Sequence, residues 1–134
     1  MRKVTAIIEM ASDGLYSIYM DAPDMDYLVT ATGATPEEAI KDFESGYDAM
    51  KQSYLEDHKP FEEVEFDFKY DMTSFLSYYS KAFSLAGLSR ITGVNQGQLS
   101  HYATGRRKPS RRTVQKIQDA ILTFSRNLCQ IRFI

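Results

Sequence analysis

The spacing of the apolar residues changes near residue 71, and this change limits the folds that are open to the chain. Before it, three segments alternate apolar and polar side chains, the period-two pattern of strands that bury one face. After it, apolar residues recur every three or four positions, as they do on helices that pack by one side. The sequence therefore predicts an α+β protein, with an α/β domain over residues 1–70 and an all-helical domain over 71–127.

The charged residues divide at the same place. Residues 1–71 hold 17 Asp and Glu against 6 Lys and Arg, whereas residues 72–134 hold 10 Lys and Arg against a single carboxylate, Asp119. The net charge of −2 conceals this separation. It favours two modules with different partners, the basic one suited to a polyanion. The alternative is that the two halves only neutralise each other.

The first domain has the pattern of three strands, a helix and a fourth strand. An Asp13-Gly14 turn joins two alternating segments into a hairpin, and a shorter strand is expected over residues 27–32. The stretch from Thr35 to Glu38 has the form of a helix N-terminus, because a capping threonine, a proline and a capping-box glutamate follow in order. Residues 64–70 alternate aromatic and charged side chains, which suits a strand at the edge of a sheet.

Two stretches of this domain carry a resemblance to a known family. They are Gly33 to Ala39, at the strand-to-helix junction, and Ala22-Pro23-Asp24. With the βββαβ order, they resemble the N-terminal domain of the HicB antitoxin family, although Met25-Asp26-Tyr27 departs from the family's usual continuation. The resemblance implies a partial ribonuclease-H-like fold without enzyme activity. It also implies a surface that binds and occludes a small basic mRNA-cutting toxin of the HicA type.

The carboxylates of the first domain raise the question of a metal-dependent nuclease. Such a site needs carboxylates that converge from different elements. Most of these side chains fall instead in turns, in loops or on the solvated face of the sheet, where acidic residues are ordinary. We therefore expect no enzyme activity, no metal and no cofactor. The residues considered are Glu9, Asp13, Asp21, Asp24 and Asp26.

The second domain contains two short helices joined through a glycine. Ser84 is a suitable cap for a helix over residues 85–92, and Gly93 suits a left-handed turn. Asn95 is a suitable cap for a helix over residues 96–103. Two short helices in tight succession, supported by further helices, form a helix-turn-helix pattern. The inner residues expected on the last helix are Val114, Ile117, Ile121 and Phe124.

The segment from Ser84 to Leu122 resembles the Xre type of phage repressor. Leu85 stands where that family often has a glutamine that contacts DNA. The resemblance implies sequence-specific binding to double-stranded DNA. Because one such domain reads only a few base pairs, we expect a homodimer on a palindromic operator. The family pattern is matched at Leu88, Gly93, Val94, Leu99, Ser100, Gly105, Arg107, Pro109 and Ser110.

Side-chain chemistry assigns two sets of DNA contacts. Glutamine can pair with adenine, hydroxyl and imidazole groups can bond base edges, and glycine lets the backbone approach closely. Cations and helix N-termini hold phosphates. The alternative is a polar helix whose cations only aid solubility. The expected base contacts are Gln96, Gly97, Gln98, Ser100 and His101, and the expected phosphate contacts are Asn95, Arg106, Arg107, Lys108, Ser110, Arg111 and Arg112.

The tail from Leu128 to Ile134 alternates in period two, so we expect it to pair as a strand or to dock in a dimer interface. Its Cys129 is the only cysteine and cannot form an intrachain disulfide, which fits a reducing cytosol. No apolar run approaches the about 18 residues of a membrane span. The N-terminus also turns acidic too early for a signal peptide. We expect a cytoplasmic protein without a membrane partner.

Together these features predict the antitoxin of a type II toxin–antitoxin pair. The first domain would neutralise a HicA-like mRNA interferase, and the second would repress the pair's own operon. The alternative is a stand-alone transcriptional repressor whose first domain senses a ligand or only dimerises.

Overall fold

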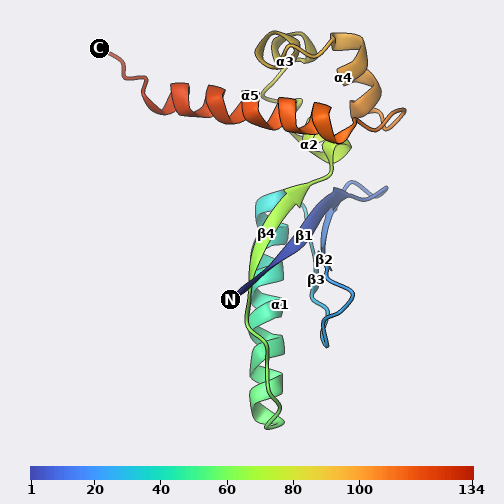
Figure 1. Cartoon of the computed structure of the whole chain (residues 1–134), viewed down its shortest axis with the longest axis vertical. Coiled ribbons are helices and arrows are strands. Elements are labelled where there is room, and N and C mark those ends of the chain that lie inside the picture. Colours follow the sequence, from blue (N-terminus) through green and yellow to red (C-terminus); the bar gives the residue numbers. More distant parts are fainter. The chain divides into compact units, whose positions relative to one another are not determined.

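Four strands and five helices make a mixed α+β protein in the computed structural model, which describes all residues from Met1 to Ile134 (Figure 1). The chain divides into two units, Met1–Asp71 (unit 1) and Met72–Ile134 (unit 2). The apolar spacing and the charge balance thus change at a structural boundary. In chain order the elements are β1 (Arg2–Met10), β2 (Tyr16–Asp21), β3 (Thr30–Gly33), α1 (Pro36–Glu56), β4 (Val64–Tyr70), α2 (Met72–Tyr79), α3 (Leu85–Thr92), α4 (Gln96–Ala103) and α5 (Arg111–Cys129).

β1 and β2 form the antiparallel hairpin expected from the sequence, with Ile8 opposite Ile18. In the turn, Gly14 has a φ of 83°, and the Asp13 carboxylate accepts a hydrogen bond from the N–H of Leu15 at 2.9 Å. Side chains alternate along both strands between a buried face and a more open face. The period-two pattern therefore sets the sidedness of the sheet.

The sheet has the strand order β3-β2-β1-β4. β3 pairs antiparallel with β2, and β4 pairs in parallel with β1, so β3 and β4 are the two edges. Helix α1 connects these two edge strands and packs along one face of the sheet, over β3 and β2 (Figure 1). The predicted order of three strands, a helix and a fourth strand is confirmed, with the fourth strand at an edge.

Hydrogen bonds at the start of α1 explain why threonine, glutamate and glycine stand at the strand-to-helix junction. The Thr35 hydroxyl oxygen accepts a hydrogen bond from the N–H of Glu38 at 3.1 Å, as a cap does. The Glu38 carboxylate accepts from the N–H of Ala34 at 3.1 Å, one residue before the cap. A Cβ on Gly33 would lie 2.4 Å from the backbone nitrogen of Ala39. Glycine is therefore required where β3 turns closely into α1.

Aromatic side chains of α1 and β4 pack against one another in unit 1. Phe43 is fully buried and lies edge-on to Phe66, with ring centroids 4.7 Å apart. Tyr47 also lies edge-on to Phe66, at 5.1 Å. The Tyr47 hydroxyl accepts a hydrogen bond from the N–H of Val64 at 3.0 Å. These contacts hold α1 against β4 and satisfy the backbone at the start of that strand.

Two residues of the segment before β3, Tyr27 and Val29, are buried although the segment is not a strand. The predicted strand over residues 27–32 is therefore wrong at its start, since β3 covers Thr30–Gly33. The ring of Tyr27 stacks on Phe61 with centroids 4.6 Å apart, and its hydroxyl donates to the Glu62 carbonyl at 2.6 Å. Burial raises the pKa of Tyr27 well above its ordinary value. Stacking against residues before β4 thus replaces strand pairing here.

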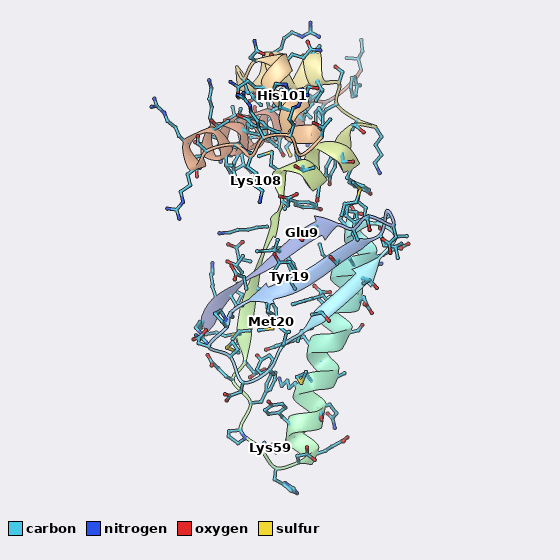
Figure 2. All side chains as sticks on the ribbon, turned by 90° about the vertical axis from the view of Figure 1, so that its right-hand side faces the viewer. Glu9, Tyr19, Met20, Lys59, His101 and Lys108 are labelled. Atoms are coloured by element: carbon cyan, nitrogen blue, oxygen red, sulfur yellow. The ribbon has the colours of Figure 1, made fainter.

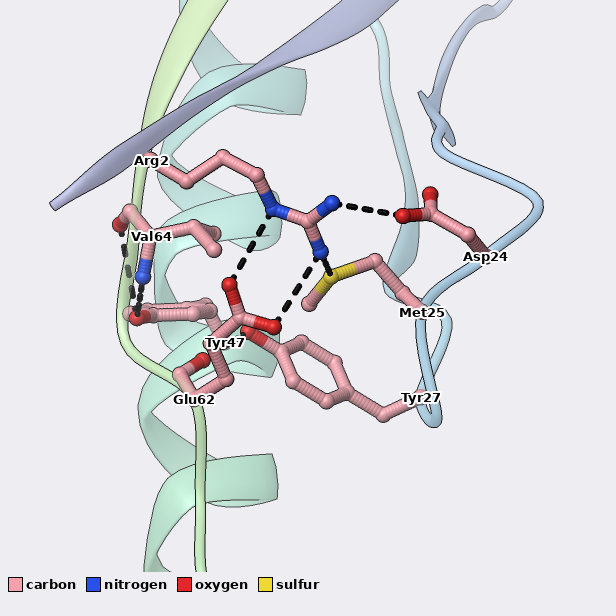
Figure 3. A network of polar contacts seen from close by, with 7 residues as sticks. All are labelled: Arg2, Asp24, Met25, Tyr27, Tyr47, Glu62 and Val64. Carbon is pink, nitrogen blue, oxygen red and sulfur yellow. Dashed lines mark hydrogen bonds and ion pairs between the residues drawn. The ribbon is translucent and has the colours of Figure 1, made fainter.

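Arg2, at the start of β1, ties two loops together (Figure 3). Its guanidinium donates to the Asp24 carboxylate at 2.6 Å, to Glu62 at 3.1 Å and to the sulfur of Met25. Through its hydrogen bond and its charge, Arg2 lowers the pKa of Asp24. Because these charged groups are exposed, the network orders the loops more than it stabilises the fold.

Unit 2 has a core of its own, to which every helix contributes. Leu76 of α2, Leu88 of α3, Leu99 and Tyr102 of α4, and Ile117 of α5 are all buried. Each helix buries one side, as its three- and four-residue spacing predicts.

Two features near the C-terminus correct the sequence-based expectation. α5 continues to Cys129, so Leu128 is helical and the tail to Ile134 forms no strand. The predicted boundary at residue 127 is wrong because no glycine or proline stops the helix there. Val114, expected to point inward, is 37% exposed, whereas Ile117 is buried.

Candidate nucleic-acid interface

A turn of three residues, Gly93 to Asn95, joins α3 to α4. Gly93 has a φ of 72°, a left-handed conformation that any residue with a Cβ adopts at a cost. Its N–H donates to the Ser89 carbonyl at 2.8 Å. The buried Thr92 hydroxyl donates to the Leu88 carbonyl at 2.7 Å and accepts from the N–H of Val94 at 3.2 Å. Local hydrogen bonds therefore fix the angle between the two helices.

Two residues predicted to contact phosphates serve as helix caps. The side-chain oxygen of Asn95 accepts from the N–H of Gly97 at 2.8 Å and from that of Gln98 at 3.4 Å. The Ser110 hydroxyl accepts from the N–H of Thr113 at 3.2 Å, at the start of α5. Each cap oxygen is thus occupied. The amide N–H groups of Asn95 can still point to a phosphate, whereas the Ser110 hydroxyl also lies 3.1 Å from the Thr113 hydroxyl, to which it can donate.

The outer face of α4 is polar and nearly free of bulky side chains. Leu99 and Tyr102 define the buried side of this helix. At about 100° per residue, the opposite side is centred on Gly97, with Ser100 and His101 beside it. Of the predicted base contacts, Gly97, Ser100 and His101 therefore share the outward side, and Gln96 and Gln98 lie on its two opposite flanks. Gln96, Gly97 and Gln98 are exposed, and Ser100 and His101 are half-buried.

Gln98 lies at one flank of this face and is held by a neighbour. The hydroxyl of Tyr102, one turn later on α4, donates to the side-chain oxygen of Gln98 at 2.7 Å. That bond occupies the acceptor of the amide and leaves its N–H groups to donate. The paired contact with adenine that the sequence allows for a glutamine needs both groups. Gln96 keeps both groups, whereas Gln98 is suited to a base or phosphate acceptor.

Five cations follow α4 in the chain and are all exposed. Arg106, Arg107 and Lys108 lie in the loop before α5, and Arg111 and Arg112 lie in its first turn (His101 and Lys108 are labelled in Figure 2). None of the five takes part in an ion pair. Cations at a helix N-terminus oppose the helix dipole, and the first turn of α5 has no acidic residue to compensate. This arrangement favours a bound anion.

Lys116 is a further cation that the sequence analysis does not assign to this surface. It lies one turn after Arg112 on α5, and its ammonium donates to the Gly93 carbonyl at 3.5 Å. It therefore stands beside the turn that leads into α4. The four-residue spacing from Arg112 is the sequence signal for a shared helix face.

The carboxylates considered for catalysis are held separately in unit 1. Glu9 accepts from the Tyr19 hydroxyl at 3.1 Å across the β1–β2 pair, and both side chains are labelled in Figure 2. Burial, with the nearby Glu9, raises the pKa of Tyr19. Asp13 belongs to the hairpin turn and Asp24 to the Arg2 network. The other two, Asp21 and Asp26, are exposed.

Comparison with known proteins leaves the site to be interpreted from its own chemistry. No family model, no curated protein and no solved structure matches this chain.

Nowhere does the structure gather three His, Cys, Asp or Glu side chains in a group that could hold a metal ion. None of the five helices combines the length and hydropathy that a membrane-spanning segment needs.

Proposed function

We propose that unit 2 is an Xre-type helix-turn-helix domain that binds double-stranded DNA. The observation that carries this proposal is the α3–turn–α4 arrangement followed by five exposed cations without carboxylate partners. In such domains the second helix, here α4, enters the major groove. Its outward side is polar and centred on Gly97, which allows close approach of the helix backbone to the base pairs.

The two groups of polar residues then have different roles. Gln96, Ser100 and His101 present hydrogen-bonding groups to base edges, which carry the sequence information. The cations at residues 106–108 and 111–112 hold phosphates, which position the domain without reading sequence. The backbone N–H groups at the N-terminus of α5 add donors for the same anions.

The phosphate assignment is tested by the salt dependence of DNA binding. The full chain selects a duplex from a random-sequence library, and affinity for it is measured from low to physiological salt. Arg106→Ala with Arg107→Ala should weaken binding to every sequence alike and lower the slope of log affinity against log salt by about 2. Arg126→Ala with Arg132→Ala, in the same unit, is the control and should leave the slope unchanged. An unchanged slope in the first variant would mean that these arginines do not hold phosphates.

We further propose that unit 1 makes the chain an antitoxin of the HicB type, with unit 2 repressing the operon of the pair. The βββαβ order and the capped junction from Gly33 to Ala39 support this, since they are the features on which the resemblance depends. The charge supports it too. A toxin that cuts mRNA must be basic to bind its substrate, and unit 1 holds 17 acidic against 6 basic residues. The separately held carboxylates are assigned no catalytic role.

Affinity capture of the tagged chain from its native host tests the antitoxin role. A short basic protein at stoichiometric amount is expected, and its cleavage of mRNA should stop when the purified chain is added. Recovery of promoter DNA without any protein would instead support a stand-alone repressor. Capture of a protein whose activity the chain does not inhibit would contradict the antitoxin role.

A further inference from the structure

The two edge strands of the sheet in unit 1 differ in how far other residues cover their outward backbone groups. At β3, which is four residues long, the N–H of Thr32 donates to the Asp42 carboxylate of α1 at 3.1 Å. β4 is seven residues long, and the Tyr47 hydroxyl covers its first residue, Val64, but not the middle of the strand around Phe66 and Phe68. A longer edge strand left open is a template for pairing with another strand.

The register of β4 on β1 shows which of its backbone groups face outward. The N–H of Asp71 donates to the Ile8 carbonyl at 3.1 Å, so the odd-numbered residues of β4 bond to β1 in this parallel ladder. The N–H and C=O groups of Phe66 and Phe68 therefore point away from the sheet. Neither residue has a hydrogen-bond partner on that side.

The side chains beside this open edge are also incompletely covered. α1 packs over β3 and β2, and its Phe43 and Tyr47 contact the rings of Phe66 and Phe68 from one side. Phe66 and Phe68 are both half-buried as a result. An added strand would satisfy the outward backbone groups and cover these two rings at the same time.

We propose that β4 pairs antiparallel with β4 of a second copy of this chain and so joins the two sheets into one. Charge selects the register. With Phe68 opposite itself, Asp67 faces Lys69 of the second copy, and the two-fold symmetry makes this pair twice. With Asp67 opposite itself, two carboxylates meet at the centre of the interface. In the selected register the like-charged pair is Glu65 with Asp71, and Asp71 lies beyond the last residue of β4.

Both charged side chains are available for such pairing. Within one chain the Lys69 ammonium lies 3.7 Å from the Asp67 carboxylate, and the two side chains are 61% and 57% exposed. They occupy non-hydrogen-bonded positions of the new ladder, where facing side chains come closest. This dimer does not depend on what unit 2 binds, so a test of the dimer and a test of the proposed function can have different outcomes.

Disulfide trapping in the full chain tests the edge and its register. Cys129 is exposed and free, so Cys129→Ser provides the background. Asp67→Cys and Lys69→Cys chains are oxidised separately and as a mixture. The mixture should form a cross-linked dimer, because facing Cβ atoms of a non-hydrogen-bonded pair lie about 4.5 Å apart, which a disulfide can span, whereas neither variant should cross-link with itself. Glu44→Cys, on the exposed side of α1, is the control and should cross-link with neither.

Every outcome of this trapping decides the proposal. Self-cross-linking of Asp67→Cys alone would place Asp67 on the axis and overturn the register. The absence of a cross-link in the mixture would overturn pairing through β4, even if the copies associate through another surface.

Exchanging the charges of Asp67 and Lys69 supplies a second measurement. Asp67→Lys or Lys69→Asp should weaken dimerisation in sedimentation about tenfold, and the double exchange should restore it.

Discussion

Asn95 illustrates how one side chain can serve the fold where a contact with DNA was expected. It caps α4 through the N–H groups of Gly97 and Gln98. Asn95→Ala should therefore lower the free energy of unfolding of unit 2 by about 1 kcal/mol, measured by urea denaturation. Asn127→Ala, at an exposed position of α5, is the control. Unchanged stability together with weaker DNA binding would identify Asn95 as a phosphate contact.

The ion pair of Arg2 with Asp24 predicts a specific dependence on pH. The hydrogen bond and charge of Arg2 hold the pKa of Asp24 below its ordinary value. A carboxylate with a lowered pKa in the folded state adds stability above its ordinary pKa of about 3.9. That stability is lost as the pH falls through the lowered value. Arg2→Gln should return the pKa of Asp24 to the ordinary range in a carboxyl NMR titration.

The control for this titration is Lys3→Gln, because Lys3 neighbours Arg2 on β1 and forms no ion pair. It should leave the pKa of Asp24 low. An equally low pKa in Arg2→Gln would mean that another group, such as the backbone near Asp24, lowers it.

At the scale of elements, two glycines predict opposite effects of the same substitution. Gly93 ends α3 with a φ of 72°, so Gly93→Ala should destabilise unit 2 by about 1–2 kcal/mol. Gly46 lies inside α1, where a Cβ would be 3.4 Å from Val29, an ordinary contact. Gly46→Ala should therefore stabilise unit 1 by up to about 1 kcal/mol. Hydrogen exchange, followed separately for the amides of each unit, measures both changes in stability. If both substitutions destabilised, or both stabilised, their units, the prediction would be wrong.

The elements could be predicted where local chemistry marks their ends. Thr35 and Pro36 mark the start of α1, and Ser84, Gly93 and Asn95 mark the short helices of unit 2. β3 could not be placed correctly, because stacking against a distant segment buries the residues before it. The prediction of a strand in the C-terminal tail is wrong, because a short alternating stretch does not by itself define a strand: Leu128 and Cys129 end α5, and residues 131–134 form neither helix nor strand.

The candidate site was predictable as a set of residue types and less so as a set of contacts. Outward positions on α4 follow from helical periodicity, since two apolar residues mark its buried side. The bond from Tyr102 to Gln98 and the approach of Lys116 to Gly93 depend on side-chain conformation and helix packing. Neither is encoded in a local pattern.

For the whole molecule, the separation of charge decides whether the two units act independently. Unit 1 is strongly acidic and unit 2 strongly basic, while the sum is only −2. At physiological salt, exposed charges farther apart than about 8 Å are largely screened. Screening therefore limits mutual neutralisation to charges in close contact, and the two-partner interpretation predicts that removing charge from unit 1 leaves DNA affinity unchanged.

Neutral variants of unit 1 test this independence. Glu44→Gln with Asp48→Asn, both exposed on α1, should slow association with a captured basic partner about threefold and leave operator affinity unchanged. Arg106→Ala with Arg107→Ala should do the reverse. Both quantities are measured on a biosensor at two salt concentrations. If the variant of unit 1 instead tightens DNA binding, the acidic half competes with DNA for the basic half. The charge separation would then mean mutual neutralisation rather than two partners.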